Sequence, residues 1–189
     1  MGILVGISGR ARHGKDTVAD YLVENFNFKK FSLATQLKHI VESSYAVDKA
    51  DIECKSSHYR SCLQSLGHFM RDLSDKEYWI KLLTVNPEFV KTAMSGHNIV
   101  ISDVRYVNEA NWVKRCGGRL WRVERVTHHG ALMCFLPESQ AKFPSEVELD
   151  RSRYGLDSYD YILVAEDGDV EGLKSLASKA YLKIVASKR

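Results

Sequence analysis

The sequence predicts an α/β protein with a mostly parallel sheet that is flanked by helices on both faces. Segments with the apolar runs of buried strands alternate along the chain with segments that have helical periodicity. A glycine-containing loop at 9–17 connects the first strand, 2–8, to the first helix, 17–23, as in the units that build parallel sheets. We expect a single domain covering residues 1–189, a length sufficient for a sizeable core.

Helices are predicted where apolar residues recur at intervals of three or four. Leu63, Leu66 and Met70 have this spacing, and Gly117-Gly118 provides a stop signal for a later helix. The expected helices cover 17–23, 34–45, 61–73, 76–84, 107–115 and 170–185.

Strands are predicted where short apolar runs occur. The expected strands cover 2–8, 29–33, 98–102, 119–123 and 160–164. The polar stretch 47–58 is expected to be a loop, and 124–144 is expected to be irregular because it contains Gly130 and Pro137. In sheets of this kind the ligand lies in the crevice at the carboxyl ends of the strands.

The loop Gly9-Arg10-Ala11-Arg12-His13-Gly14-Lys15-Asp16-Thr17 fits the G-x-x-x-x-G-K pattern of a phosphate-binding P-loop. Asp16 stands where Ser or Thr is usual. Backbone N–H groups of such a loop surround phosphate oxygens, and Lys15 would reach the β- and γ-phosphates. The motif narrows the predicted fold to the three-layer P-loop NTPase fold. The candidate nucleotide-binding residues are Gly9, Arg12, His13, Gly14, Lys15, Asp16 and Thr17.

Composition excludes several classes of partner. A net charge of +3 does not indicate the concentrated basic surface of proteins that bind nucleic-acid polymers. No apolar run approaches the roughly 20 residues of a membrane helix, and we see no signal peptide. Four widely spaced cysteines beside a nucleotide loop favour reduced thiols and a cytoplasmic location. We therefore expect small molecules as partners, with no nucleic-acid polymer and no membrane.

Charged residues outside the loop are candidates for phosphoryl-transfer chemistry. Asp103 follows the apolar strand 98–102, where a carboxylate can hold Mg²⁺ or a bound substrate. Arginines can stabilise the charge on a transferring phosphoryl group, and the preferred candidates are Arg105, Arg122 and Arg125. A structural acid and solvated surface arginines are the alternative interpretations.

The segment 124–145 has the length and composition of a lid that closes over phosphates and excludes water. An ordinary surface excursion is the alternative. The histidines and cysteines in and near this segment lack the spacing of a zinc site, because no C-x-x-C occurs in the chain.

Four blocks in roughly the first 150 residues carry a family resemblance. They are Gly14–Leu22, Leu63–Gly67 with Arg71-Asp72 and Trp79, Ser102–Ala110, and Pro144-Ser145-Glu146 with Leu149-Asp150. In these blocks the chain resembles the deoxynucleoside monophosphate kinases of tailed bacteriophages, which are relatives of the adenylate kinase group. The block Asp103-Val104-Arg105 with Asn108-Glu109-Ala110 is more specific than the loop alone.

The resemblance implies transfer of the γ-phosphoryl group of ATP, with Mg²⁺, to a deoxynucleoside 5′-monophosphate. It implies a helical monophosphate-binding region at about 33–95, a lid at about 124–145 and, for a phage protein, the host cytoplasm. Arg60 would grip the monophosphate, Gln64 and Trp79 would contact sugar or base, and Gly67 would let the backbone approach the ligand. Where the family often has a hydroxyl residue after this glycine, the chain has His68.

The resemblance also implies roles at the phosphates. Lys15 would contact the donor phosphates, and Asp16, Thr17 and Asp103 are the candidate metal ligands, with Asp103 also a candidate for substrate binding. Arg105, Arg122 and Arg125 would cover the transferring group. No general base is needed, because the acceptor is an anionic phosphate oxygen. Both a monomer and a homodimer are compatible with the sequence.

Three alternatives stay open at this stage. The first is another small-molecule P-loop kinase, of the phosphomevalonate or dephospho-coenzyme A type, and the Gly-Lys-Asp start also occurs in the phosphomevalonate group. A GTPase-like switch would need an Asn-Lys-x-Asp motif, which the chain lacks. A P-loop protein that only binds a nucleotide, without catalysis, is the third.

Overall fold

In the part of the chain that the structure describes, the sheet has five strands, all parallel. The computed structural model describes residues 2–44, 47–74 and 76–187. The strands are β1 (Leu4–Ser8), β2 (Phe28–Phe31), β3 (Asn98–Val104), β4 (Arg119–Val126) and β5 (Tyr161–Glu166). Their order across the sheet is β2-β3-β1-β4-β5, and every neighbouring pair is parallel. The predicted α/β fold class is therefore confirmed.

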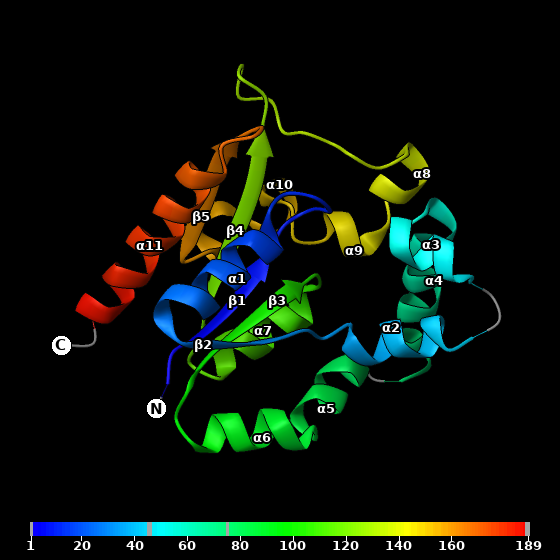
Figure 1. Cartoon of the computed structure of the whole chain (residues 1–189), viewed down its shortest axis with the longest axis horizontal. Helices are drawn as coiled ribbons and strands as arrows, with labels where there is room; N and C mark the ends of the chain where they lie inside the picture. The colour runs from blue at the N-terminus through cyan, green and yellow to red at the C-terminus, as the bar shows by residue number, and fades with distance from the viewer. Residues whose placement is uncertain (1, 45–46, 75, 188–189) are drawn as a thin grey trace.

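Helices cover both faces of this sheet and extend beyond one end of it (Figure 1). They are α1 (Lys15–Phe26), α2 (Thr35–Glu42), α3 (Lys49–Cys54), α4 (Ser57–Leu73), α5 (Tyr78–Thr84), α6 (Pro87–Met94), α7 (Val107–Arg115), α8 (Glu138–Ala141), α9 (Pro144–Val147), α10 (Arg151–Tyr154) and α11 (Val170–Ala186). A short 3₁₀ helix follows at Leu156–Ser158. No helix within the described ranges is long and apolar enough to cross a membrane.

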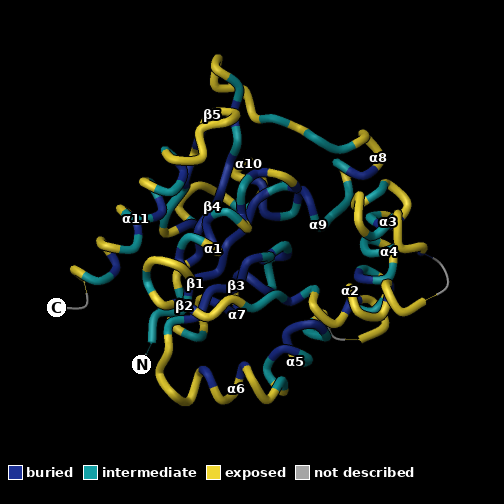
Figure 2. The backbone as a smooth tube through the Cα atoms, in the orientation of Figure 1, coloured by how far each residue is buried: buried dark blue, intermediate teal, exposed yellow. Residues whose placement is uncertain are grey.

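Two apolar cores lie on opposite faces of the sheet. On one face, α1 and α11 pack against strand residues that include Val5 and Trp121. On the other face, α7 joins a larger cluster that continues into α2, α4, α5 and α6. Figure 2 shows the buried backbone concentrated in the sheet and the helices that cover it, whereas α3 and the outer parts of α6 are exposed. The helices α2 to α5 therefore form a flank beside the β2–β3 half of the sheet (Figure 1).

The structure corrects two expectations about helices. The expected loop at 47–58 contains α3, because the Asp48 side chain accepts a hydrogen bond from the Asp51 N–H at 2.8 Å and caps the helix. The helix α6 was not expected, although Asn86 caps it and Pro87 occupies its first turn. Both helices are short, so capping signals mark them better than periodicity does. The expected helix 34–45 ends at Glu42, and its last residue, Tyr45, lies outside the described residues.

The start of the expected irregular segment was also wrong. The strand β4 continues to Val126, because it pairs with β5 as far as Glu166, so Glu124 and Arg125 are strand residues. The segment between β4 and α9 then contains a turn, a bridge between Val126 and Leu132, and α8. Irregular backbone is therefore limited to parts of 127–143.

A buried charge network joins β4 to the segment after α9. Arg122 is 1% exposed and donates to Asp150 at 2.7 Å and to Glu124 at 3.3 Å. Asp150 also accepts from Arg10, and Glu124 is also paired with Arg151 at 2.9 Å. Because each buried charge has a partner, the network secures the chain that follows α9 against the sheet.

We expect Arg122→Ala to lower the free energy of unfolding by about 3 kcal/mol, because it leaves two buried carboxylates with a missing partner. Urea denaturation measures this change. Arg119→Ala is the matched control on the same strand: its ion pair with Asp160 is half-exposed, and its loss is expected to cost at most about 1 kcal/mol. Equal losses in the two variants would contradict the assignment.

Candidate active site

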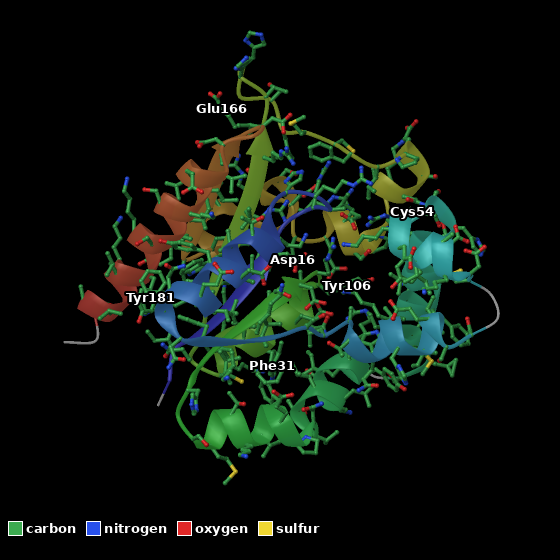
Figure 3. The ribbon with its side chains drawn as sticks, in the orientation of Figure 1. Asp16, Phe31, Cys54, Tyr106, Glu166 and Tyr181 are labelled. Carbon is green, nitrogen blue, oxygen red and sulfur yellow. The ribbon has the colours of Figure 1, made fainter. Side chains whose placement is uncertain are left out.

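A cavity of about 550 Å³ opens at the carboxyl ends of the central strands, between the P-loop and the helical flank. It is bordered by the loop 9–17, the β2–α2 connection, α4, the β3–α7 connection and α9. Nine of the predicted site residues line it: Arg12, Lys15, Asp16, Arg60, Gln64, Gly67, Trp79, Asp103 and Arg105. Figure 3 labels two lining residues, Asp16 and Tyr106, near the middle of the molecule. The fold therefore brings distant sequence blocks to one cavity.

The P-loop has a backbone that only particular residues can adopt. Gly9, Arg12 and Gly14 have φ values of 150°, 64° and 93°. A Cβ atom on Gly9 would lie 2.5 Å from the Val123 carbonyl oxygen, and one on Gly14 would lie 2.7 Å from Leu173. Gly14 is also the N-cap of α1. The two glycines therefore allow the loop to lie against β4 and α11 while it turns into the helix.

The side chain of Lys15, the first residue of α1, turns back to the preceding loop. Its side chain is nearly buried, and its Nζ donates to the Arg10 carbonyl oxygen at 2.8 Å. Burial, together with the charge of Arg105, moves the pKa of Lys15 well below its usual value. A bound anion would favour the charged form again, so this lysine is suited to phosphate.

Asp16 presents a largely exposed carboxylate to the edge of the cavity. Lys30 donates to it at 2.8 Å and to Asp20 at 2.9 Å. Burial raises the pKa of Asp16, but the Lys30 hydrogen bond and nearby positive charges outweigh this and lower the pKa overall. The lowered pKa favours the ionised form of the carboxylate, which is the form that binds cations.

The donor set fits Mg²⁺ held mainly by phosphates. Within the described parts of the chain, no group of three or more His, Cys, Asp or Glu side chains is placed to hold a metal ion. Magnesium in phosphate sites commonly uses one or two carboxylates together with phosphates and water. Asp16 and Asp103 line the cavity and provide such carboxylates, whereas Thr17 is not among the lining residues.

Asp103 anchors the β2–α2 connection. Its Oδ1 accepts from the Leu33 N–H at 2.8 Å, and its Oδ2 accepts from Ser32 Oγ at 2.6 Å and the Ala34 N–H at 3.0 Å. A carboxylate has about four acceptor positions, so capacity remains for one more partner. The structural role is therefore observed, and the metal or substrate role stays a prediction.

Arg105 is held at both ends by buried carboxylates. Its backbone N–H donates to Glu109 at 2.7 Å, and its Nη1 donates to Glu146 at 2.8 Å. Burial raises the pKa of Glu109 to about 7, although Arg71, whose guanidinium stacks 3.5 Å from the Tyr106 ring centroid, opposes this rise. Arg60 also lines the cavity, and burial lowers its pKa.

The structure does not bring Arg122 or Arg125 to the cavity. Arg122 belongs to the buried network described above. Arg125 pairs with Asp167, donates to the Arg12 carbonyl oxygen at 3.3 Å and lies over the Phe135 ring. Both arginines therefore have structural contacts. The structure gives no support to the prediction that they contact a transferring phosphoryl group.

Three residues predicted for the monophosphate pocket, Gln64, Gly67 and Trp79, lie on α4 and α5. The Trp79 indole N–H donates to the Gly67 carbonyl oxygen at 3.1 Å, so only the ring is left for a ligand. A Cβ atom on Gly67 would lie 3.0 Å from Leu37, so this glycine also allows α2 and α4 to pack closely. Gln64 donates to the Gln140 carbonyl oxygen at 3.3 Å and connects the pocket to α8.

His13 connects the P-loop to the expected lid instead of facing the cavity. It is 2% exposed, its Nδ1 accepts from the Arg125 N–H at 3.3 Å, and its Nε2 is 3.0 Å from the Met133 carbonyl oxygen. Because Nδ1 accepts, Nε2 is the donor. Burial, with the charges of Lys15 and Arg122, lowers the pKa of His13 to about 4.

Sequence reasoning assigned no individual role to several cavity residues. Glu109 and Glu146 belong to blocks of the family resemblance, but nothing in the pattern indicated that both hold Arg105. Tyr59 and Glu42, which are hydrogen-bonded to each other at the end of the cavity formed by α2 and α4, gave no signal. Their positions depend on helix packing, which short motifs do not encode.

Two sequence comparisons find similarity to nucleotide kinases, one of them over a segment that contains the P-loop. The model of the deoxynucleotide monophosphate kinase family matches residues 3–59. A putative deoxynucleotide monophosphate kinase of Acanthamoeba polyphaga mimivirus is 29% identical over 190 residues, covering 86% of this chain and 88% of that protein. These two matches support a nucleotide kinase, and the expected bacteriophage source stays a prediction.

Two solved structures of kinases align with nearly the whole chain at low sequence identity. Shikimate kinase from Bacteroides thetaiotaomicron has a TM-score of 0.47 at 13% identity, covering 96% of this chain and 98% of that one. Dephospho-CoA kinase from Campylobacter jejuni has a TM-score of 0.47 at 11% identity, covering 96% of each chain.

The His13 contacts predict a pH dependence of stability. Between pH 6.5, the ordinary pKa of histidine, and about 4, the unfolded chain binds a proton that the folded chain excludes, so stability falls as pH falls. His13→Asn keeps an acceptor but does not titrate. We expect the unfolding free energy of wild type relative to this variant to fall by on the order of 1 kcal/mol per pH unit in that window. Denaturant melts at several pH values measure it, and parallel curves would contradict the prediction.

Proposed function

We propose that the protein transfers the γ-phosphoryl group of ATP to a deoxynucleoside 5′-monophosphate and forms the diphosphate. The observation that carries this proposal is the continuity of the cavity from the P-loop to the helical flank. Cationic side chains, Lys15, Arg12 and Arg105, line it beside the loop. Apolar and aromatic side chains, among them Leu63 and Trp79, line it in the flank. Such a cavity suits two ligands that each carry phosphate at one end and differ in the rest of the molecule.

The sequence comparisons support the choice of acceptor. The family whose model matches residues 3–59 and the viral relative are both named for deoxynucleotide monophosphates. The matched segment contains the P-loop and α2, and α2 contributes cavity residues such as Leu37. An aromatic and an amide side chain, Trp79 and Gln64, are chemically suited to a nucleoside.

The proposed mechanism depends on positioning and charge. The loop N–H groups and Lys15 bind the donor phosphates, and Arg105 and Arg60 face the phosphates of donor and acceptor. Asp16 and Asp103 would hold Mg²⁺, which would supply positive charge beside the phosphates. No side chain has to remove a proton, because the acceptor oxygen is already anionic.

The regions of the domain take matching roles in this proposal. Residues of about 33–95 form the monophosphate-binding region, which here comprises α2 to α6. The lid, expected at about 124–145, begins after β4 ends at Val126. Its α8 contacts α4 through the Gln140 side chain, which donates to the Ser57 carbonyl oxygen at 2.8 Å. Water is excluded when this segment covers the phosphates.

The central test is acceptor-dependent turnover. With MgATP, we expect purified protein to form ADP, and the matching diphosphate, with at least one deoxynucleoside monophosphate. A coupled ADP assay with chromatography of the products measures both. The panel contains all common deoxynucleoside and ribonucleoside monophosphates, together with dephospho-coenzyme A and phosphomevalonate. ADP formation that never exceeds the acceptor-free background across the nucleotide panel would falsify the proposal.

Lys15→Ala tests the loop. We expect at least a 100-fold loss of turnover with a folded protein, because the charge that stabilises the transferring phosphoryl group is removed. Circular dichroism and thermal melting check the fold. Lys174→Ala is the control, since Lys174 lies on α11 and pairs there with Glu171. Wild-type turnover in Lys15→Ala would rule out the loop assignment.

A further inference from the structure

The Glu146 carboxylate connects the P-loop to the arginine of the β3–α7 connection. Its Oε2 accepts from the Ala11 backbone N–H at 2.8 Å, and its Oε1 accepts from Arg105 Nη1 at 2.8 Å. One side chain from α9 thus binds two elements that are far apart in the sequence. A carboxylate is the acceptor in both bonds and a guanidinium is the donor in one, and such charge-assisted hydrogen bonds are stronger than neutral ones.

This carboxylate is held firmly at the wall of the cavity. Glu146 is 5% exposed, and its neighbours Val147 and Leu149 are buried in the core. Asp150, four residues further on, pairs with Arg10 and Arg122. The backbone that carries Glu146 is therefore fixed to both the loop and the sheet.

The contacts leave part of the Arg105 guanidinium for a ligand. Nη1 donates to Glu146 and to the Ser145 carbonyl oxygen at 3.3 Å. A guanidinium has five N–H donors, and Arg105 lines the cavity. The other end of the residue is held by Glu109 through the backbone N–H. Two carboxylates thus restrict both the position of the residue and the rotation of its side chain.

We infer that Glu146 is a positioning residue that sets the Arg105 guanidinium at a defined place relative to the P-loop. The inference rests on the proposed function, in which Arg105 acts on phosphates bound at the loop. The bridge costs desolvation of a carboxylate, which its two charge-assisted bonds offset. In return, the arginine is in place before a ligand binds, so less ordering is needed when phosphates arrive.

A competing role for Glu146 has the opposite consequence. A carboxylate between a loop N–H and an arginine also resembles a bound phosphate, and it would then compete with the ligand for these donors. Removal of its charge would strengthen anion binding in that case. Under the positioning role, removal of the charge weakens anion binding and slows transfer, because Arg105 loses its place.

The experiment combines Glu146→Gln with Arg105→Lys in a double-mutant cycle. The amide keeps the shape of the side chain but accepts through only one oxygen, so one of the two partners is lost. Glu148→Gln is the matched control: Glu148 lies on the same segment and also accepts a backbone N–H, that of Val107 at 2.8 Å. It is not among the residues that line the cavity.

We expect Glu146→Gln to lower kcat by about 10- to 100-fold, as a misplacement near 1 Å does, with KM for ATP changed less than about threefold. In the Arg105→Lys background the same change is expected to have less than about a threefold effect, because the residue to be positioned is gone. Glu148→Gln is expected to stay within about twofold of wild type. Independent, multiplicative effects in the cycle, or wild-type kcat in Glu146→Gln, overturn the inference.

Calorimetric measurement of the binding of inorganic tripolyphosphate separates this inference from the proposed function. A wild-type protein that never phosphorylates a nucleotide refutes the function, yet the bridge is still tested by this probe. We expect at least threefold weaker binding in Glu146→Gln; equal or tighter binding overturns the inference. Thermal melting checks the fold, and Glu146→Asp, which is too short to reach both partners, replaces the amide variant in the same measurements if that variant does not fold.

Discussion

The conformation of the loop 9–17 is the constraint on which the rest of the site depends. Its turn requires left-handed or glycine-only backbone at Gly9, Arg12 and Gly14, and each glycine lies where a side chain would collide with β4 or α11. The loop is therefore shaped by tertiary packing as much as by its own sequence.

Buried carboxylates hold this loop from the far end of the chain. Glu146 binds the Ala11 N–H, Asp150 binds the Arg10 side chain, and His13 binds the Met133 carbonyl oxygen in the segment that follows β4. Ionised groups are costly to bury, and they are retained here because each has a charged or hydrogen-bonding partner. The connection that follows β4 is therefore held at Met133 and again at Glu146 and Asp150. Only the residues between these two points are not held to the loop by these bonds.

Charged residues of one type have different roles according to their position on a strand or connection. Arg122 lies inside β4 and donates its hydrogen bonds to Asp150 and Glu124, whereas Arg105 follows β3 and lines the cavity. Asp103 does both: it accepts hydrogen bonds from the β2–α2 connection, and it also lines the cavity. A count of arginines near a predicted cleft does not separate these cases, because side-chain direction is set by strand pairing.

The sequence by itself determined the fold class, the P-loop and its flanking elements, and nine of the residues that line the cavity. Local signals sufficed for these, since glycine spacing, apolar runs and the acid at the end of β3 depend on neighbours in the chain. Tertiary structure alone decided the burial of Arg122, the contact of His13 with the Met133 backbone and the carboxylate bridge at Glu146. Each of these joins residues more than twenty positions apart, and their contacts exist only once the sheet has brought the segments together.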